Sequence, residues 1–194
     1  PSMPVGRLRI TYTARRAPLG SDRGDAVPTL VVATAAPTVW PSTTTIATVP
    51  WTRNEKAATA GVKSTSYADN VVALAWAHDR GASEAVFANT QGELCEGTGT
   101  NVFVVVDGRV LTPPLTSGCL AGVTRDLVIE WFGASEVDLP IEVLHEADEV
   151  FVTSSTRNVH PVVRADHREW GGPGPISRDL QAAFDEFAAK RQDP

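Results

Sequence analysis

The sequence contains no long apolar run. No stretch approaches the roughly 20 residues that a membrane-spanning helix needs, and the N-terminus lacks the basic-then-apolar layout of a signal peptide. We therefore expect a soluble cytoplasmic protein with no membrane partner. The chain has two cysteines, Cys95 and Cys119, without a metal-type spacing. Reduced thiols are expected rather than a disulfide framework.

Metal and nucleic-acid sites also lack their usual signals. The four histidines show no paired ligand spacing, so no metal is expected. No G-x-x-x-x-G-K-[ST] motif is present, and "GTGTN" is too short and wrongly placed for a dinucleotide fingerprint. Residues 1–56 carry seven Lys and Arg against three Asp and Glu, whereas residues 57–194 carry ten against twenty. The acidic remainder disfavours a nucleic-acid partner.

The chain does contain a mixture of strand and helix patterns. With 194 residues, 42% of them apolar, it can bury a substantial core. "RLRITYT" and "TLVVATA" read as strands, and prolines follow them in a linker-like setting. Two strands alone are not independently stable. We therefore predict a domain remnant at 1–36 that consists of strands only, a linker at 37–41 and a large domain at 42–194. Upstream sequence is expected to be missing.

Within residues 42–194, strands and helices are predicted to alternate in an α+β (mixed α/β) arrangement. Strand patterns occur at 43–49, 83–89 and 101–106, and the "DG" at 107–108 predicts a hairpin into the next strand. Helices are predicted at 66–80, from about residue 123, and near the C-terminus, where apolar residues recur with a helical period. The apolar stripes of the last two helices are expected to face the core.

Four polar features stand between these elements. Lys63, in "GVKSTSYADN", precedes serine and threonine residues that suit a helix N-terminus, where a cation gains nothing from the helix dipole. Glu96 opens "EGTGTN". The loop "LAGVTRD" at 120–126 places Gly122 and Thr124 at a helix start, where backbone N–H groups suit an anion. "VTSST" at 152–156 clusters hydroxyls after a strand. Each feature alone also has an ordinary structural explanation, as a surface lysine, a turn carboxylate, a capping loop or a turn.

Together the four features match the needs of pyridoxal 5'-phosphate (PLP). This cofactor uses an amine to bind its aldehyde, a carboxylate beside its pyridine nitrogen, and N–H groups and hydroxyls around its phosphate. Sequence separation alone does not show that these groups converge in space.

Residues 51–188 resemble the class IV, or fold-type IV, PLP enzymes. The resemblance is carried in order by "GVKSTSY", "ELCEGTGTNVF", "LAGVTRDLVIE" and "ADEVFVTSSTRNVHPV", and it continues through "GPGPISRDLQAAF". This group contains branched-chain aminotransferases, D-amino acid transaminases and aminodeoxychorismate lyases. The resemblance implies a large PLP-binding domain, with residues 1–36 as the remnant of a small N-terminal α/β domain.

The resemblance also implies residue roles. Lys63 is the catalytic, Schiff-base lysine, and Glu96 is the partner of the pyridine nitrogen. Tyr67 either touches the cofactor or packs beneath it, and Thr100 and Asn101 shape the Glu96 turn. The remaining residues implied to bind the cofactor are Leu120, Gly122, Val123, Thr124 and Ser155. Those implied to reach the substrate are Ser154, Thr156 and Arg157.

The segments "TSYADNVVALA" and "ANTQGELCEGTGTNVF" are most similar to the sequences of aminodeoxychorismate lyases, which form 4-aminobenzoate and pyruvate in folate biosynthesis. The alternative is an aminotransferase that acts on branched-chain or D-amino acids, and a further alternative is an inactive cofactor-binding fragment. In relatives the small domain supplies an arginine and pocket residues, so the missing part bears on activity. A small-molecule amino or oxo acid substrate and a homodimer are also implied.

Overall fold

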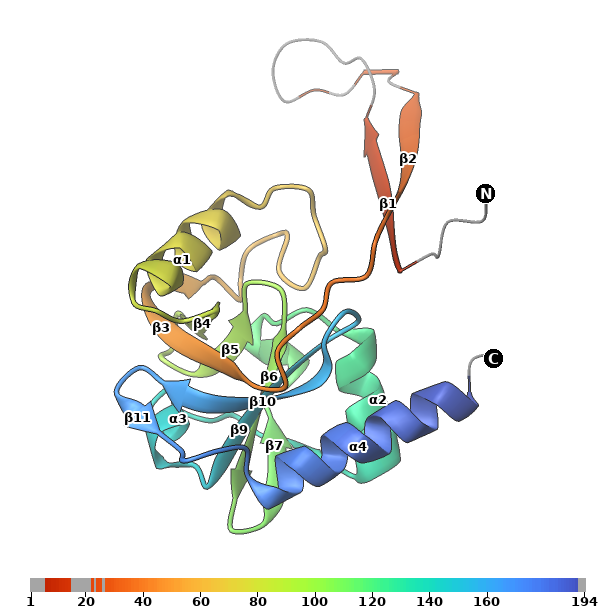
Figure 1. The fold of residues 1–194 in the computed structure, drawn as a ribbon. Coiled ribbons are helices and arrows are strands. Elements are labelled where there is room, and N and C mark those ends of the chain that lie inside the picture. The colour runs from red at the N-terminus through yellow and green to blue at the C-terminus, as the bar shows by residue number, and fades with distance from the viewer. Residues whose placement is uncertain (1–5, 15–21, 23, 26, 192–194) are drawn as a thin grey trace. The chain divides into compact units, whose positions relative to one another are not determined.

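The computed structural model describes residues 6–14, 22, 24–25 and 27–191 (Figure 1). The chain divides into two compact units, Pro1–Val39 and Trp40–Pro194. None of the helices in these described residues is long and apolar enough to cross a membrane.

The first unit contains a two-stranded antiparallel hairpin. Strand β1 (Arg7–Ala14) pairs with β2 (Pro28–Ala35) along the full length of both strands. Both expected strands are therefore confirmed. Because side chains alternate between the faces of a strand, apolar residues collect on one face, and their side chains are more than half exposed: Leu8, Ile10, Tyr12, Leu30 and Val32. The identity of this unit as a remnant of a small domain stays a prediction.

The second unit is built on a nine-stranded mixed sheet. Its strands are β3 (Thr44–Arg53), β4 (Glu84–Asn89), β5 (Leu94–Gly97), β6 (Asn101–Val106), β7 (Arg109–Thr112), β8 (Ser135–Glu136), β9 (Glu149–Ser154), β10 (Asn158–Ala165) and β11 (Arg168–Glu169). Strands β10, β3, β4, β5, β6 and β9 pair in succession, and β9 pairs again with β10. The sheet thus closes into a ring, which removes the open edges that a flat sheet would leave on these strands.

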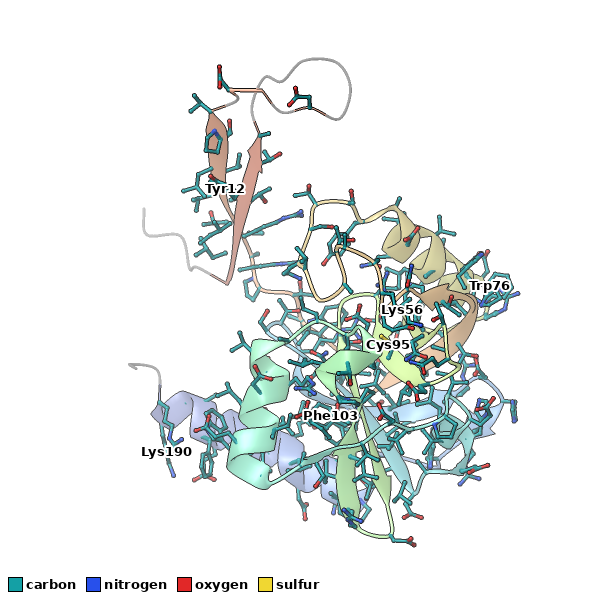
Figure 2. All side chains as sticks on the ribbon, turned by 180° about the vertical axis from the view of Figure 1, so that it is seen from behind. Tyr12, Lys56, Trp76, Cys95, Phe103 and Lys190 are labelled. Atoms are coloured by element: carbon teal, nitrogen blue, oxygen red, sulfur yellow. The ribbon has the colours of Figure 1, made fainter. Side chains whose placement is uncertain are left out.

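Apolar side chains alternate between the two faces of this ring. Val102 and Val104 of β6 belong to one buried cluster with Val150 and Val152 of β9. Phe103, labelled in Figure 2, faces the other way and belongs to a second buried cluster. Its ring stacks on a neighbouring ring of β9 at 4.8 Å between centroids. This period of two gives each strand a role in both cores.

Helices cover the sheet on its outer face. Helix α1 (Ala68–Asp79) packs on β3 and β4, which it connects as a parallel pair. Helix α2 (Val123–Phe132) contacts β9, and α4 (Pro175–Lys190) contacts β9 and β10. Figure 1 shows α2 and α4 side by side, in agreement with the buried cluster they share. Two short helices complete the fold: η1 (Leu115–Ser117) and α3 (Val143–Glu146).

The start of α1 differs from the prediction. The N-cap position is Tyr67, and no side chain in the described part of the chain caps the helix there. Ser64 instead accepts a hydrogen bond from the backbone N–H of Ser66 within its own turn, at 3.2 Å. Val71 and Val72 near the start of this helix are more than half exposed, whereas Ala73 and Ala77 are buried. The mixed α and β fold and the three main helices are as expected.

Candidate functional site

Glu96 lies on β5, where it pairs with Phe87 of β4. Its neighbour Cys95, labelled in Figure 2, marks this position in the sheet. The Glu96 side chain is 15% exposed, and its Oε1 accepts a hydrogen bond from Arg53 Nε at 3.1 Å. Its Oε2 accepts one from the backbone N–H of Leu120 at 2.9 Å. The carboxylate therefore joins β5 to the loop that precedes α2.

The charge of Glu96 depends on these partners. Burial raises the pKa of Glu96, while the Leu120 N–H, the Arg53 guanidinium and the Lys63 ammonium oppose that rise. A carboxylate in a desolvated site needs charged or N–H partners to stay ionised. The two donors thus hold a buried negative charge in a fixed orientation.

Arg53 is a partner of Glu96 that the sequence analysis missed. It ends β3, its Nη2 donates to Asn70 Oδ1, and its guanidinium stacks over the Phe87 ring at 4.0 Å. Asn70 in turn donates to the carbonyl oxygen of Thr98 at 2.8 Å. The start of α1, which follows Lys63, is thereby tied to the turn that follows Glu96. No local spacing signals this arrangement, because the residues come from three separate parts of the chain.

Lys63 lies in the loop between β3 and α1, and its side chain is exposed. Its Nζ donates a hydrogen bond to the Tyr67 hydroxyl at 3.1 Å. Its positive charge lowers the pKa of Glu96, so the ammonium acts on that carboxylate. Of the two residues on which the sequence interpretation most depended, Lys63 thus contacts Tyr67 and affects Glu96 through its charge alone.

The loop before α2 leaves backbone donors at a helix N-terminus. Gly122 is the N-cap, and within the described residues no side chain caps this end. Asn101 holds the loop by donating to the Leu120 carbonyl at 2.8 Å. A Cβ at Gly122 would lie 2.1 Å from Asn101 Oδ1, so the loop can approach Asn101 only without a side chain there. Val123 is exposed and Thr124 is buried. N–H groups at such an end attract an anion.

The clustered hydroxyls lie in the turn between β9 and β10. Ser155 and Thr156 are exposed, and Ser154 Oγ accepts the backbone N–H of Arg157 at 3.2 Å. Thr153, the residue before this turn, pairs with Asn101 of β6, which also holds the Gly122 loop. The sheet thus connects the hydroxyl turn to the predicted anion loop.

Arg157 has an environment unlike that of its neighbours in the turn. Its side chain is only 8% exposed, with Nη2 lying 3.5 Å from Glu84 Oε2. The guanidinium stacks over the ring of Trp40 at 4.0 Å. The proposed contact of Arg157 with substrate stays a prediction, and its observed contacts are with the protein interior.

Comparison with known proteins places this chain in a family. The model of the family described as amino-transferase class IV matches residues 1–165. The chain belongs to this family. D-alanine aminotransferase of Staphylococcus haemolyticus is 36% identical over 140 residues, which cover 67% of this chain and 48% of that protein.

Two solved class IV structures extend the similarity to the fold. The branched-chain aminotransferase of Thermoproteus uzoniensis, solved with norvaline, matches with a TM-score of 0.88 and 26% identity over 96% of this chain and 65% of that one. The branched-chain amino acid aminotransferase of Thermobaculum terrenum, solved in its PLP-form, matches with a TM-score of 0.81 and 29% identity over 90% of this chain and 62% of that one. The chain spans about half the length of the curated relatives it matches.

Class IV enzymes depend on PLP, and the groups present here fit that cofactor. A reactive amine at Lys63, an oriented carboxylate at Glu96 and an uncapped helix start at Gly122 are the donor and acceptor types it needs. The absence of a Cβ at Gly122 lets the helix start lie against Asn101, which donates to the carbonyl oxygen of Leu120.

Proposed function

We propose that this chain supplies the cofactor-binding and proton-transferring residues of a PLP-dependent enzyme that acts on an amino acid or a 2-oxo acid. One observation carries the proposal above the others. The Glu96 carboxylate accepts the Leu120 N–H and the Arg53 guanidinium, and the Lys63 charge acts on the same carboxylate. These interactions support a site in which Lys63 would supply the amine, Glu96 the acceptor for a ring N–H and the loop at Gly122 the anion-binding N–H groups.

When bound, PLP withdraws electrons from the Cα of an amino substrate. Glu96 would hold a proton on the pyridine nitrogen, because its two donors favour the charged carboxylate against the rise in pKa that burial causes. Lys63 Nζ would take a proton from Cα and return one. The Tyr67 hydroxyl would orient that nitrogen through the 3.1 Å hydrogen bond. Gly122, Val123, Thr124 and Ser155 would hold the phosphate, and Leu120 would pack on the ring.

For the complete reaction we favour amino acid transamination. The relatives at 35–36% identity carry the names of branched-chain or D-alanine aminotransferases. The prediction of an aminodeoxychorismate lyase is not supported by the names of these relatives. It rests on the sequence similarity of the segments around Lys63 and Glu96. It is the second candidate, since both reactions would use the same lysine and carboxylate. A homodimer and a cytoplasmic location are further parts of this proposal.

A product assay separates the candidates. The PLP-treated chain is incubated with branched-chain or D-amino acids plus 2-oxoglutarate, and separately with 4-amino-4-deoxychorismate alone. A new amino acid that forms only with the 2-oxo acceptor supports transamination, whereas pyruvate released without an acceptor supports the lyase. K63A should abolish either product, while K56A, which alters a lysine 79% exposed, should not.

The inactive-fragment alternative predicts a different result. Equilibrium dialysis against PLP measures the number of molecules bound per chain. About one per chain, reduced in E96A, is expected from the proposal. A chain that retains no PLP would contradict the proposed function, whichever reaction the relatives catalyse.

A further inference from the structure

A buried carboxylate stands beneath the turn that follows Glu96. Glu84, the first residue of β4, is 2% exposed. Its Oε1 accepts the backbone N–H groups of Ala85 at 3.0 Å and Thr98 at 3.1 Å, and also the Thr98 hydroxyl. Its Oε2 accepts the Thr100 hydroxyl at 3.4 Å. Glu84 therefore fixes both sides of the Thr98–Thr100 turn.

Arg157, in the turn between β9 and β10, supplies the opposite charge. Its Nη2 lies 3.5 Å from Glu84 Oε2, and its Nη1 donates to Thr44 Oγ1 at 3.4 Å. The guanidinium stacks on Trp40. A buried carboxylate without a partner is strongly unfavourable, so the pair constrains both residues. The constraint extends to the backbone of Arg157, in the turn of exposed hydroxyls.

The pair thus joins two loops that are distant in sequence. Glu84 holds the turn that follows Glu96, while Arg157 closes the turn formed by Ser154, Ser155 and Thr156. Within the described part of the chain, no hydrogen bond ties the side-chain hydroxyls of Ser154, Ser155 and Thr156 to another segment, because Ser154 contacts Thr156 at 3.4 Å and the backbone N–H of Arg157 at 3.2 Å. The buried side chain of Arg157 is the part of this turn that reaches the interior.

We infer that Arg157 and Glu84 are positioning residues, which hold the Ser154–Thr156 turn so that its hydroxyls meet the phosphate of the cofactor. This inference rests on the proposed function and assigns Arg157 to the protein interior instead of the substrate. The pair acts through the turn and touches no reacting atom. Its loss should weaken recognition of the phosphate more than recognition of the pyridine ring.

The test compares the binding of PLP with that of pyridoxal, which lacks the phosphate. Dissociation constants for both are measured by equilibrium dialysis on the whole chain. Because R157A would leave Glu84 unpaired and could unfold the protein, the variants are R157K and the double variant E84Q/R157M, which removes both charges together. R164M is the matched control, since Arg164 lies on β10, the strand that follows Arg157, but donates to the carbonyl oxygens of Gly81 and Asp166.

In both test variants the preference for PLP over pyridoxal should fall about tenfold, roughly the affinity of one hydrogen bond to a charged group. The affinity for pyridoxal should stay within about twofold, and R164M should keep the wild-type preference. Thermal unfolding checks that each variant is folded. An unchanged preference in the folded variants, or an equal loss for both ligands, would overturn the inference. If the wild-type chain binds neither ligand, the proposed function fails as well.

Discussion

Substitution by alanine should lower the stability of the protein at one glycine of the "EGTGTN" motif and leave it nearly unchanged at the other. A Cβ at Gly97 would lie 2.1 Å from Thr100 Oγ1 and 3.3 Å from both Ala85 O and Glu84 Cδ, whereas a Cβ at exposed Gly99 meets no atom within 4 Å. In G97A, Thr100 must move and give up its hydrogen bond to Glu84. Overpacking costs about 1–3 kcal/mol, and the lost hydrogen bond adds about 1 kcal/mol. We therefore expect G97A to lower the free energy of unfolding by about 2–4 kcal/mol.

Urea unfolding followed by tryptophan fluorescence measures this difference. G99A should stay within about 0.5 kcal/mol of the wild type, as is usual for surface changes. The double variant G97A/T100A should be more stable than G97A, because removing the Thr100 hydroxyl relieves the closest contact. Equal losses in G97A and G99A, or no recovery in the double variant, would refute the packing described for this turn.

Three further predictions concern charge and thiol chemistry. R53M should destabilise the chain by about 1.5–3 kcal/mol at pH 7, the value of a hydrogen bond to a charged group; the loss should be smaller at pH 5 than at pH 7, because burial raises the pKa of Glu96 and protonation removes the charge that Arg53 stabilises. Equal losses in urea unfolding at the two pH values would count against this. Burial lowers the pKa of His160 from 6.5, so the unfolded chain binds a proton more readily and stability should fall as the pH drops through about 6.5; H160Q should flatten that dependence. Burial also raises the pKa of Cys95 and Cys119, so iodoacetamide should label neither thiol in the native protein and both in denaturant, as mass spectrometry would show.

The sequence predicted those parts of the fold that have a local pattern. The hairpin at "DG" and the buried strand Asn101–Val106 followed from alternation and turn chemistry, and they were confirmed. Strand β5 was missed because its four residues, Leu94–Gly97, lie within a segment dominated by turn residues. The start of α1 was misjudged because its serines bond within their own turn.

For the site, the resemblance implied residues that would approach a ligand but not the residues that hold them in place. Glu84 looks like an ordinary strand residue in the sequence, and apart from the adjacent Ala85 N–H its partners, which are Thr98, Thr100 and Arg157, come from segments that only the folded sheet brings together. Arg53 was missed for the same reason. Arg157 was interpreted by its position in a hydroxyl-rich turn, whereas its long side chain reaches a buried carboxylate. Burial of charge is a tertiary property, which spacing alone does not reveal.

The central claim is that Lys63 is the lysine that binds the cofactor. The chain has three lysines, and Lys56 and Lys190, both labelled in Figure 2, serve as internal controls. The chain is incubated with PLP, reduced with borohydride and digested, and the peptides are analysed by mass spectrometry. The account predicts that the reduced cofactor is attached to Lys63, at close to one per chain, and that E96Q lowers this yield. Attachment mainly to Lys56 or Lys190, or no attachment at all, would contradict it.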